Sequence, residues 1–361
     1  MPTTAEIRAA AARLRQGFEA KGALSVETPI LQPAEALLDL YGEEIRARAY
    51  VASDALRGEQ MLRPDFTVPV VQMHMDVGAE PARYTYAGEV FRRQEDDPDR
   101  ANEYVQVGYE VFDRENPIDS DAEVFAVLQE AVAGVPLRAA TGDIGILIAA
   151  VDGLDTTTVR KQALRRHLWH PRRFRALLDR FSGQSEVPAA RKALLEAEDA
   201  FAEAGPQIGL RSRAEVEARI AALRLDAQTA PLATRDVELM DAILQVRETL
   251  PNALEHLRDI AVDLTAIGPA VERLGRRMRA LDSRGVDVSQ LDFEASYGRT
   301  SMEYYDGFVF GFYAESRPDL PAVATGGRYD ALTKVLGQGQ EIPAVGGVIR
   351  PGLLLELEQT S

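Results

Sequence analysis

Arg92, Gln106 and Glu110 have the types and spacing that suit the binding of a small zwitterion. A glutamate accepts hydrogen bonds, an arginine binds a carboxylate, and a glutamine amide both donates and accepts. The alternating sequence around them predicts two strands, over residues 84–92 and 104–112. Gln106 and Glu110 then share one face of the second strand, because side chains two apart in a strand do so. An amphipathic hairpin with a solvated polar face is the alternative interpretation.

The composition is that of an acidic globular protein of 361 residues, 46% hydrophobic and 27% charged. The 41 lysines and arginines stand against 57 acidic residues, a net charge of −16. Because nucleic-acid affinity depends on neutralising phosphates with basic residues, we expect no binding of tRNA or DNA. The sequence contains no long apolar run and no apolar segment near its start, so we expect no membrane span, no secretory signal and a cytoplasmic location.

Several kinds of chemistry are excluded or disfavoured. The absence of cysteine excludes disulfides, thiolate catalysis and cysteine-ligated metals. The sequence has no GxGxxG, Walker P-loop or HExxH motif, which disfavours a doubly wound nucleotide-binding fold, and we expect no cofactor. His167 and His170 lie three apart on a predicted helix but lack acidic residues nearby, so we expect no metal site.

The densest basic patch has a helical pattern and comprises Arg165, Arg166, His167, Arg172, Arg173 and Arg175. We interpret it as a solvated helix face or as a protein-contact patch. Trp169, the only tryptophan, lies inside this stretch and is expected to serve packing.

The patterns divide the chain into three parts. Strand-like segments alternate with helices over residues 1–152 and return over residues 257–361. Residues 153–256 are rich in alanine, arginine and glutamate, with helical periodicity. We therefore expect an α+β core with a mostly antiparallel sheet, interrupted by a mostly α-helical insertion.

Four local predictions bear on candidate sites. Asp65 or Thr67 precedes the apolar run of a helix that extends to about Val77, so either could cap that helix. Residues 45–53 and 302–313 alternate like strands. Gly326-Gly327 is predicted to open a helix, where its N–H groups could face an anion.

The order of these segments resembles the catalytic core of class II aminoacyl-tRNA synthetases, and specifically histidyl-tRNA synthetase. The resemblance is carried by the N-terminal helix and strand up to Pro29 (motif 1, the dimer interface of that class), residues 91–110 (motif 2), residues 302–310 (the histidine-specific segment), and TGGRYD at 325–330 with PAVGG at 343–347 (the approach to motif 3). It implies a class II core that dimerises, with helices flanking its sheet. Unlike the synthetase, this chain is expected to have no anticodon-binding domain after its last helix.

The resemblance also implies a histidine pocket. Its residues would be Asp65, Thr67, Arg92, Gln106, Glu110, Tyr304 and Tyr305. In such a pocket Glu110 suits the α-ammonium group and Arg92 the carboxylate, while a glutamine or tyrosine suits an imidazole nitrogen.

Departures from the synthetase pattern argue against catalysis. Thr300 replaces the histidine-specific arginine, and a one-residue slip along a strand would turn the adjacent Arg299 to the other face. Gln94 replaces a carboxylate of motif 2, and Leu353 replaces the ATP-binding arginine of motif 3. Because adenylate formation needs cations that stabilise the triphosphate, we expect this pocket to sense a ligand, and we assign no catalytic residue.

This combination resembles the regulatory subunits of ATP phosphoribosyltransferase, which are paralogues of the synthetase; the stretches at residues 37–50 and 62–67 fit that family better. The resemblance implies a non-catalytic subunit in a hetero-oligomer with the short-form catalytic subunit. It would activate the first step of histidine biosynthesis and take part in feedback inhibition by L-histidine, bound in this pocket or at the subunit interface. The alternatives are an active adenylate-forming enzyme like histidyl-tRNA synthetase and a synthetase-like binding module with another partner.

Overall fold

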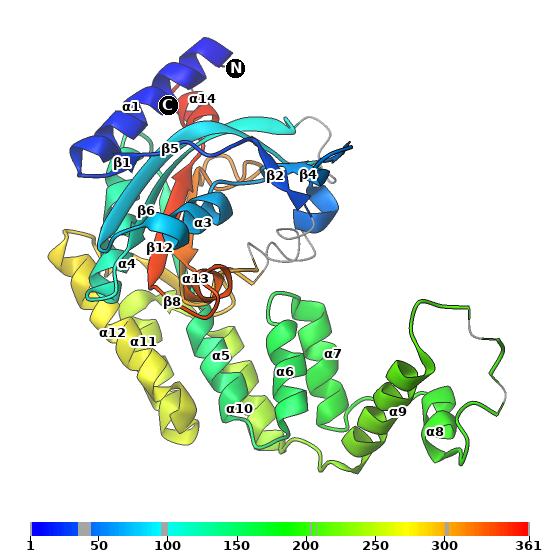
Figure 1. Cartoon of the computed structure of the whole chain (residues 1–361). Coiled ribbons are helices and arrows are strands. Elements are labelled where there is room, and N and C mark those ends of the chain that lie inside the picture. Colours follow the sequence, from blue (N-terminus) through cyan, green and yellow to red (C-terminus); the bar gives the residue numbers. More distant parts are fainter. Residues whose placement is uncertain are drawn as a thin grey trace.

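The computed structural model describes residues 2–34, 45–94, 100–202, 204–206, 208–299 and 303–359, which form two β-sheets and a set of helices (Figure 1). The strands are β1 (Leu24–Ser25), β2 (Leu31–Pro33), β3 (Val51–Asp54), β4 (Gly58–Leu62), β5 (Ala82–Phe91), β6 (Glu103–Phe112), β7 (Arg138–Asp143), β8 (Arg247–Thr249), β9 (Asp292–Glu294), β10 (Phe308–Tyr313), β11 (Ala324–Arg328) and β12 (Ala344–Ile349). The larger sheet has the order β1-β5-β6-β12-β11-β10-β7-β9-β8, and the smaller one β2-β4-β3.

The larger sheet is mostly antiparallel, as predicted. Within the described residues only the β1–β5 and β7–β9 pairs run parallel. The β5–β6 hairpin pairs without interruption from Ala82 opposite Phe112 to Phe91 opposite Glu103. The predicted hairpin is therefore confirmed; β5 lies between β1 and β6, and β6 pairs with β12 on its other side.

One face of the larger sheet is covered by helices from both ends of the chain (Figure 1). These helices are α1 (Thr4–Ala20), α4 (Pro117–Ala131) and α14 (Pro351–Glu358), with α12 (Gly268–Ser283), α11 (Leu250–Asp263) and the 3₁₀ helix η1 (Thr265–Ile267) stacked beside α4. Phe18 of α1 packs on Tyr109 of β6, with ring centroids 5.4 Å apart. Tyr109, Val107 and Val111 thus belong to one large apolar core.

The opposite face of β6 has a different environment. There α3 (Thr67–Val77) and α13 (Asp330–Leu336) pack against each other. Tyr86, Phe112 and Tyr329 form part of a second apolar cluster on this side. Glu110 alternates with Tyr109 along β6, so the two faces separate as the sequence predicts.

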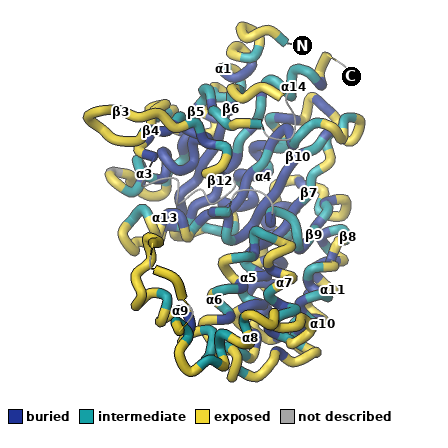
Figure 2. The backbone as a smooth tube through the Cα atoms, turned by 90° about the vertical axis from the view of Figure 1, so that its right-hand side faces the viewer, coloured by how far each residue is buried: buried dark blue, intermediate teal, exposed yellow. Residues whose placement is uncertain are grey.

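The part between β7 and β8 is helical and extends away from the sheet (Figure 1). Its helices are α5 (Ile144–Gly153), α6 (Thr158–Arg166), α7 (Pro171–Phe181), α8 (Ala189–Glu196), α9 (Arg213–Gln228) and α10 (Thr234–Gln245). The far helices α8 and α9 are mostly exposed (Figure 2): α8 buries no residue and α9 buries Ile220. The helical character is as predicted, whereas the domain division at residues 152 and 256 stays a prediction.

Two predicted strands are shorter than expected. The pattern over 45–53 contains a helical turn at 45–48, with Ile45 buried, before β3 begins at Val51. In the pattern over 302–313, β10 begins only at Phe308, and Tyr304 and Tyr305 precede it outside any strand. Apolar residues in turns that face a core give the same alternation as a strand, and here tertiary packing decides.

The predicted helix opening at Gly326-Gly327 is wrong. Both glycines lie inside β11 and pair with β10 on one side and β12 on the other. They are glycines because neighbours leave no room: a Cβ on Gly326 would lie 2.5 Å from the Gly346 carbonyl oxygen. The proposed presentation of their N–H groups to an anion is therefore excluded.

Candidate ligand-binding site

The start of α3 is fixed by packing rather than by a side-chain cap. The N-cap residue is Phe66, which makes no cap hydrogen bond and stacks on Tyr86 with centroids 4.3 Å apart. Buried Arg63 lies over the other side of the Phe66 ring and donates to the carbonyl oxygens of Thr28 (2.5 Å) and Glu89 (2.8 Å). These contacts position Asp65 and Thr67 over the sheet, beside Glu110.

Glu110 is the centre of the site. It is fully buried and accepts hydrogen bonds from three hydroxyl groups: Thr67 (3.2 Å) and Tyr86 (2.7 Å) at Oε1, and Tyr329 (2.5 Å) at Oε2. No lysine or arginine of the described chain forms an ion pair with this carboxylate. Its negative charge is therefore solvated by dipoles alone.

Glycines on neighbouring strands make room for these side chains. A Cβ on Gly346 of β12, which pairs with Glu110, would lie 1.4 Å from its Oε2 atom. A Cβ on Gly108 of β6 would lie 2.1 Å from the Tyr86 ring. The carboxylate and the tyrosine can therefore lie flat on the sheet only because both positions lack a side chain.

Asp65, Arg92 and Tyr304 form a second group beside Glu110. Tyr304 donates its hydroxyl hydrogen to Asp65 Oδ2 (3.1 Å), and Arg92 Nη2 lies 3.9 Å from the same oxygen. Arg92 Nε donates to the Pro64 carbonyl oxygen (2.7 Å). Tyr305 packs on Tyr304, with centroids 5.0 Å apart. Asp65 thus accepts a hydrogen bond within the site, and the cap of α3 does not depend on it.

Gln106 lies on the same face of β6 as Glu110 and is almost fully buried. Its Oε1 atom has no hydrogen-bond partner among the described residues. An unsatisfied buried acceptor is costly, so this amide oxygen is free to accept a donor from a ligand.

The structure therefore gathers six of the seven predicted pocket residues through hydrogen bonds, an ion pair and ring packing, and places Gln106 on the same strand face as Glu110. Thr300, the position of the missing arginine, lies outside the described residues. Arg299 lies in a turn rather than a strand, and its Nε donates to the Leu168 carbonyl oxygen (2.7 Å). Gln94 accepts from Arg48 Nη2 (3.1 Å), and Leu353 packs on the large apolar core.

Burial sets the electrostatics of the site. It raises the pKa of Glu110 to about 7, and nearby Asp65 adds to the rise, while the three hydroxyl donors oppose it. Burial and the Glu110 charge raise the pKa of Tyr86 and of Tyr329 well above the ordinary value. Two carboxylates near a single arginine make a site that favours a ligand with a positive charge.

Sequence reasoning missed two tyrosines that hydrogen-bond to Glu110. Tyr86 was part of the predicted hairpin, and its position opposite Gly108 in β6 is the signal that could have found it. Tyr329 was expected on a helix but lies between β11 and α13, where it is the N-cap residue of α13. The glycine at 346 also belonged to a quoted motif, yet its contact with Glu110 depends on the pairing of β6 with β12.

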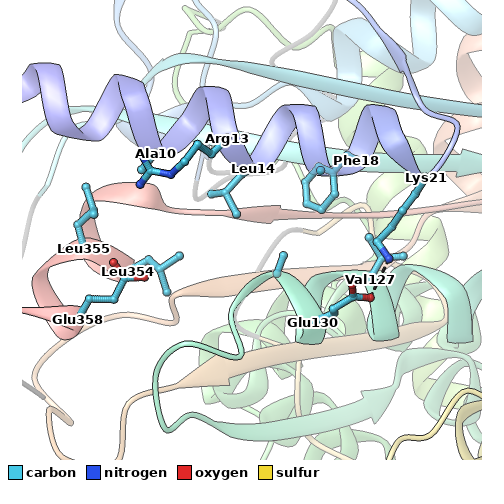
Figure 3. A pocket seen from close by; sticks show the side chains of 12 residues that line it. Ala10, Arg13, Leu14, Phe18, Lys21, Val127, Glu130, Leu354, Leu355 and Glu358 are labelled. Carbon is cyan, nitrogen blue, oxygen red and sulfur yellow. Dashed lines mark hydrogen bonds and ion pairs between the residues drawn. The ribbon is translucent and has the colours of Figure 1, made fainter.

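Two cavities lie elsewhere. A groove of about 310 Å³ between α1, α4 and α14 has an apolar floor that includes Leu14, Phe18 and Leu354, with the Lys21–Glu130 ion pair (2.7 Å) at its rim (Figure 3). A cavity of about 940 Å³ lies at the start of α4, beside α12. Neither is lined by the predicted pocket residues. Within the described residues, no group of three potential metal ligands occurs, and no helix is long and apolar enough to span a membrane.

Comparison with known proteins identifies relatives of nearly full length. The family model described as "Histidyl-tRNA synthetase" matches residues 1–208 and 212–351. Proteins of Rhizobium etli and Agrobacterium fabrum described as "ATP phosphoribosyltransferase regulatory subunit" are each 31% identical, with 93% of both chains covered. One from Rhizobium rhizogenes with the same description is 28% identical, covering 91% of this chain and 92% of its own.

Solved structures share the fold. A protein of Bacillus halodurans described as "ATP phosphoribosyltransferase regulatory subunit/histidyl-tRNA synthetase" superposes with a TM-score of 0.69 at 21% identity, covering 99% of this chain and 81% of that one. Histidyl-tRNA synthetase from Nostoc gives a TM-score of 0.63 at 17% identity, covering 97% and 70%.

The sheet and its flanking helices define a class II aminoacyl-tRNA synthetase-like core of the histidyl type, which confirms the predicted fold class. Within that class, the chain belongs to the family of ATP phosphoribosyltransferase regulatory subunits.

Proposed function

We propose that this chain is a non-catalytic regulatory subunit that assembles with the short-form catalytic subunit of ATP phosphoribosyltransferase, activates it and takes part in its feedback inhibition by histidine. The names of its relatives support the partner. The pocket supports the effector: a buried, dipole-solvated carboxylate next to Asp65, Arg92 and an unsatisfied Gln106 oxygen suits a small amino acid with a second polar end.

Glu110 is the observation that carries the histidine assignment. A buried carboxylate without a cationic partner is unfavourable, and an ammonium group beside it would neutralise it. Three hydroxyls already orient the carboxylate, so a ligand finds it preorganised. Gln106 Oε1 and the tyrosine hydroxyls can then bind an imidazole N–H.

The pocket surroundings support sensing over catalysis. Leu353 on α14 packs into the apolar core, so this position offers no cation to a triphosphate. Gln94 at the end of the hairpin is neutral. An adenylate-forming enzyme needs such charges, and the alternative function therefore predicts a histidine-dependent ATP–pyrophosphate exchange that we expect to be absent.

Self-association is part of the proposal. Leu24, on the segment that resembles motif 1, and Ile30 and Leu31, directly after it, expose 64%, 43% and 53% of their surface. Neighbouring exposed apolar side chains of this size are typical of a contact surface. We infer a synthetase-like dimer built on this segment within the hetero-oligomer.

The test is formation of phosphoribosyl-ATP from ATP and phosphoribosyl pyrophosphate. The short catalytic subunit is assayed alone, with this chain, and with this chain plus histidine. We expect strong activation that histidine reverses. No activation, with the two chains separating on a sizing column, would discard the proposed function.

Glu110→Ala then tests the pocket. We expect weaker histidine inhibition with assembly intact, because the ammonium partner is removed. Glu103→Ala, on the exposed start of the same strand, is the matched control. Unchanged inhibition in Glu110→Ala would place the feedback site elsewhere, such as the subunit interface.

A further inference from the structure

The helices α6 and α7 are strongly basic in an acidic chain. From Thr158 to Phe181 there are eight lysines and arginines and one acidic residue, a net charge of +7. The remaining residues hold 33 basic and 56 acidic residues, a net charge of −23. Such asymmetry creates a local field of opposite sign to that of the whole molecule.

Some of these charges serve the fold. Buried Arg160 donates to the Asp226 carboxylate (2.6 Å) and to the carbonyl oxygen of Ala230 (2.8 Å). Arg180 also pairs with Asp226 (3.2 Å), and Arg175 pairs with Asp241. These contacts join α6 and α7 to α9 and α10 and explain three of the basic residues.

Lys161 donates to the Asp152 carbonyl oxygen (2.8 Å). The remaining four form what we call the arginine face, which comprises the exposed Arg165, Arg166, Arg172 and Arg173. Arg165 has an ion pair with Asp152 (3.3 Å), but both side chains are about half exposed, and such pairs contribute little. Arg166 and Arg172 have no hydrogen bond or ion pair with any described residue. Phe174, Leu178 and Phe181 are the buried side of α7, so its arginines at 172 and 173 face outwards.

The turn between α6 and α7 contacts the segment that carries the pocket tyrosines. His170 Nε2 lies 3.6 Å from Glu303 Oε1, next to Tyr304. Arg299 Nε donates to the Leu168 carbonyl oxygen (2.7 Å), and Trp169 packs against both apolar clusters. A partner bound on the arginine face would therefore lie beside contacts that reach the pocket.

We propose that the arginine face is the surface by which this chain binds an acidic surface of the catalytic subunit. This rests on the proposed function and supplies the contact surface that it lacks. The helices α6 and α7 that carry this face lie far from α1 and α14 (Figure 1), so a partner bound there leaves the motif 1-like contact free. A protein partner fits better than a nucleic acid, because the chain as a whole carries −16 and the tryptophan in this stretch is packed inside.

The test is the double variant Arg166→Glu/Arg172→Glu, which reverses two charges whose side chains make no hydrogen bond or ion pair with the described residues. Its affinity for the catalytic subunit is measured by titration of activation and by calorimetry at two salt concentrations. We expect affinity to fall about tenfold or more, with a weaker salt dependence than wild type, because charges at an interface steer association. Its melting temperature should match wild type.

Arg276→Glu/Arg279→Glu is the matched control. These arginines of α12 are also exposed, make no contact with described residues, and change the net charge equally. Control affinity within about twofold of wild type is expected, since distant surface charges add little. Equal weakening by both variants, or no weakening by Arg166→Glu/Arg172→Glu, would overturn the inference.

Two further outcomes separate the possibilities. If wild type neither binds nor activates the catalytic subunit, the proposed function fails and the inference falls with it. If wild type activates normally and the double variant does so equally well but loses binding to a bulk tRNA preparation, the proposed function stands and the arginine face is a nucleic-acid site.

Discussion

Two groups of buried charges in this molecule are built in different ways. One joins α4, α12, β7 and β11: Arg277 donates to Asp121 and Asp143 (2.7 Å each), and Arg328 donates to Asp121 (2.9 Å). In the pocket, the Glu110 carboxylate accepts side-chain hydrogen bonds only from hydroxyl groups of the described residues. The first group neutralises its carboxylates internally, whereas the second leaves a carboxylate for something else to neutralise.

This difference distinguishes buried charges that stabilise the fold from a buried charge that is available to a ligand. Buried ion pairs with full hydrogen bonding hold elements together, and removing one partner is costly. A buried carboxylate with dipoles alone has a raised pKa and gains from a cationic ligand. Substitutions in the two groups should therefore differ in their effects on stability, pH dependence and ligand binding.

Arg277→Met should destabilise the protein most. It leaves the carboxylates of Asp121 and Asp143 buried without the arginine that contacts both, and breaking such a pair typically costs about 3–5 kcal/mol. Urea unfolding measures the change. Arg279→Met, two residues along α12 and exposed, should change the free energy by less than about 0.5 kcal/mol. A loss below about 1 kcal/mol in Arg277→Met would contradict the structural role of this group.

Glu110→Gln should act mainly through pH. The pKa of Glu110 is raised to about 7 in the folded protein, above its value of 4.5 in a solvated chain. The folded state therefore binds more protons between these values, and wild-type stability falls as pH rises through that window, by about 3 kcal/mol in total. Glu110→Gln lacks the carboxylate that causes this loss. Between pH 5 and pH 8 its free energy of unfolding should therefore fall less than that of wild type.

Unfolding of both proteins across pH 4–8 measures this difference. Asp306, whose pKa burial and Asp330 also raise to about 7, is present in both proteins, so its contribution cancels. Parallel stability curves for wild type and Glu110→Gln would show that Glu110 is not the charge that the pocket leaves uncompensated.

The residues of the pocket could be predicted from the sequence, whereas the ion-paired group around Arg277 could not. Motif spacing placed Glu110, Arg92 and the two tyrosines in one site, because local strand alternation and the family pattern both act over short stretches. The Arg277 group could not be predicted, since its members come from four elements that meet only after folding. The contact of Tyr329 with Glu110 could not be predicted for the same reason, because it depends on the pairing of β6 with β12.

Predictions failed where packing overrides a local pattern. Gly326 and Gly327 have the signal of a helix start, yet a strand on each side and the Tyr305 ring, 2.8 Å from a Cβ on Gly327, require glycine in a strand. Arg299 was assigned to a strand, but it lies in a turn directed at the helical part. Both outcomes depend on residues far away in the sequence, so the local sequence pattern does not predict them.

Histidine binding should release protons from Glu110 if the ammonium group lies beside it. A nearby cation lowers the pKa of a carboxylate, so at pH 7 about half a proton should leave this group on binding. Calorimetry in two buffers of different ionisation enthalpy measures the release. Glu110→Gln should lose it and bind about tenfold more weakly, whereas Glu103→Gln should match wild type. Equal proton release by wild type and Glu110→Gln would place the ammonium elsewhere.

Arg299→Met should have the smallest effect on the free energy of unfolding, in contrast to Arg277→Met. Both arginines are buried, and burial lowers the pKa of Arg299 to about 10, with Arg175 adding to the decrease. Arg299 stacks on Phe174, and its Nη2 has no hydrogen-bond partner among the described residues. Because it neutralises no carboxylate, its removal leaves no uncompensated charge, and we expect a change in unfolding free energy below about 1 kcal/mol. A loss as large as that of Arg277→Met would mean that burial alone, rather than pairing with a carboxylate, determines what a charge contributes to this fold.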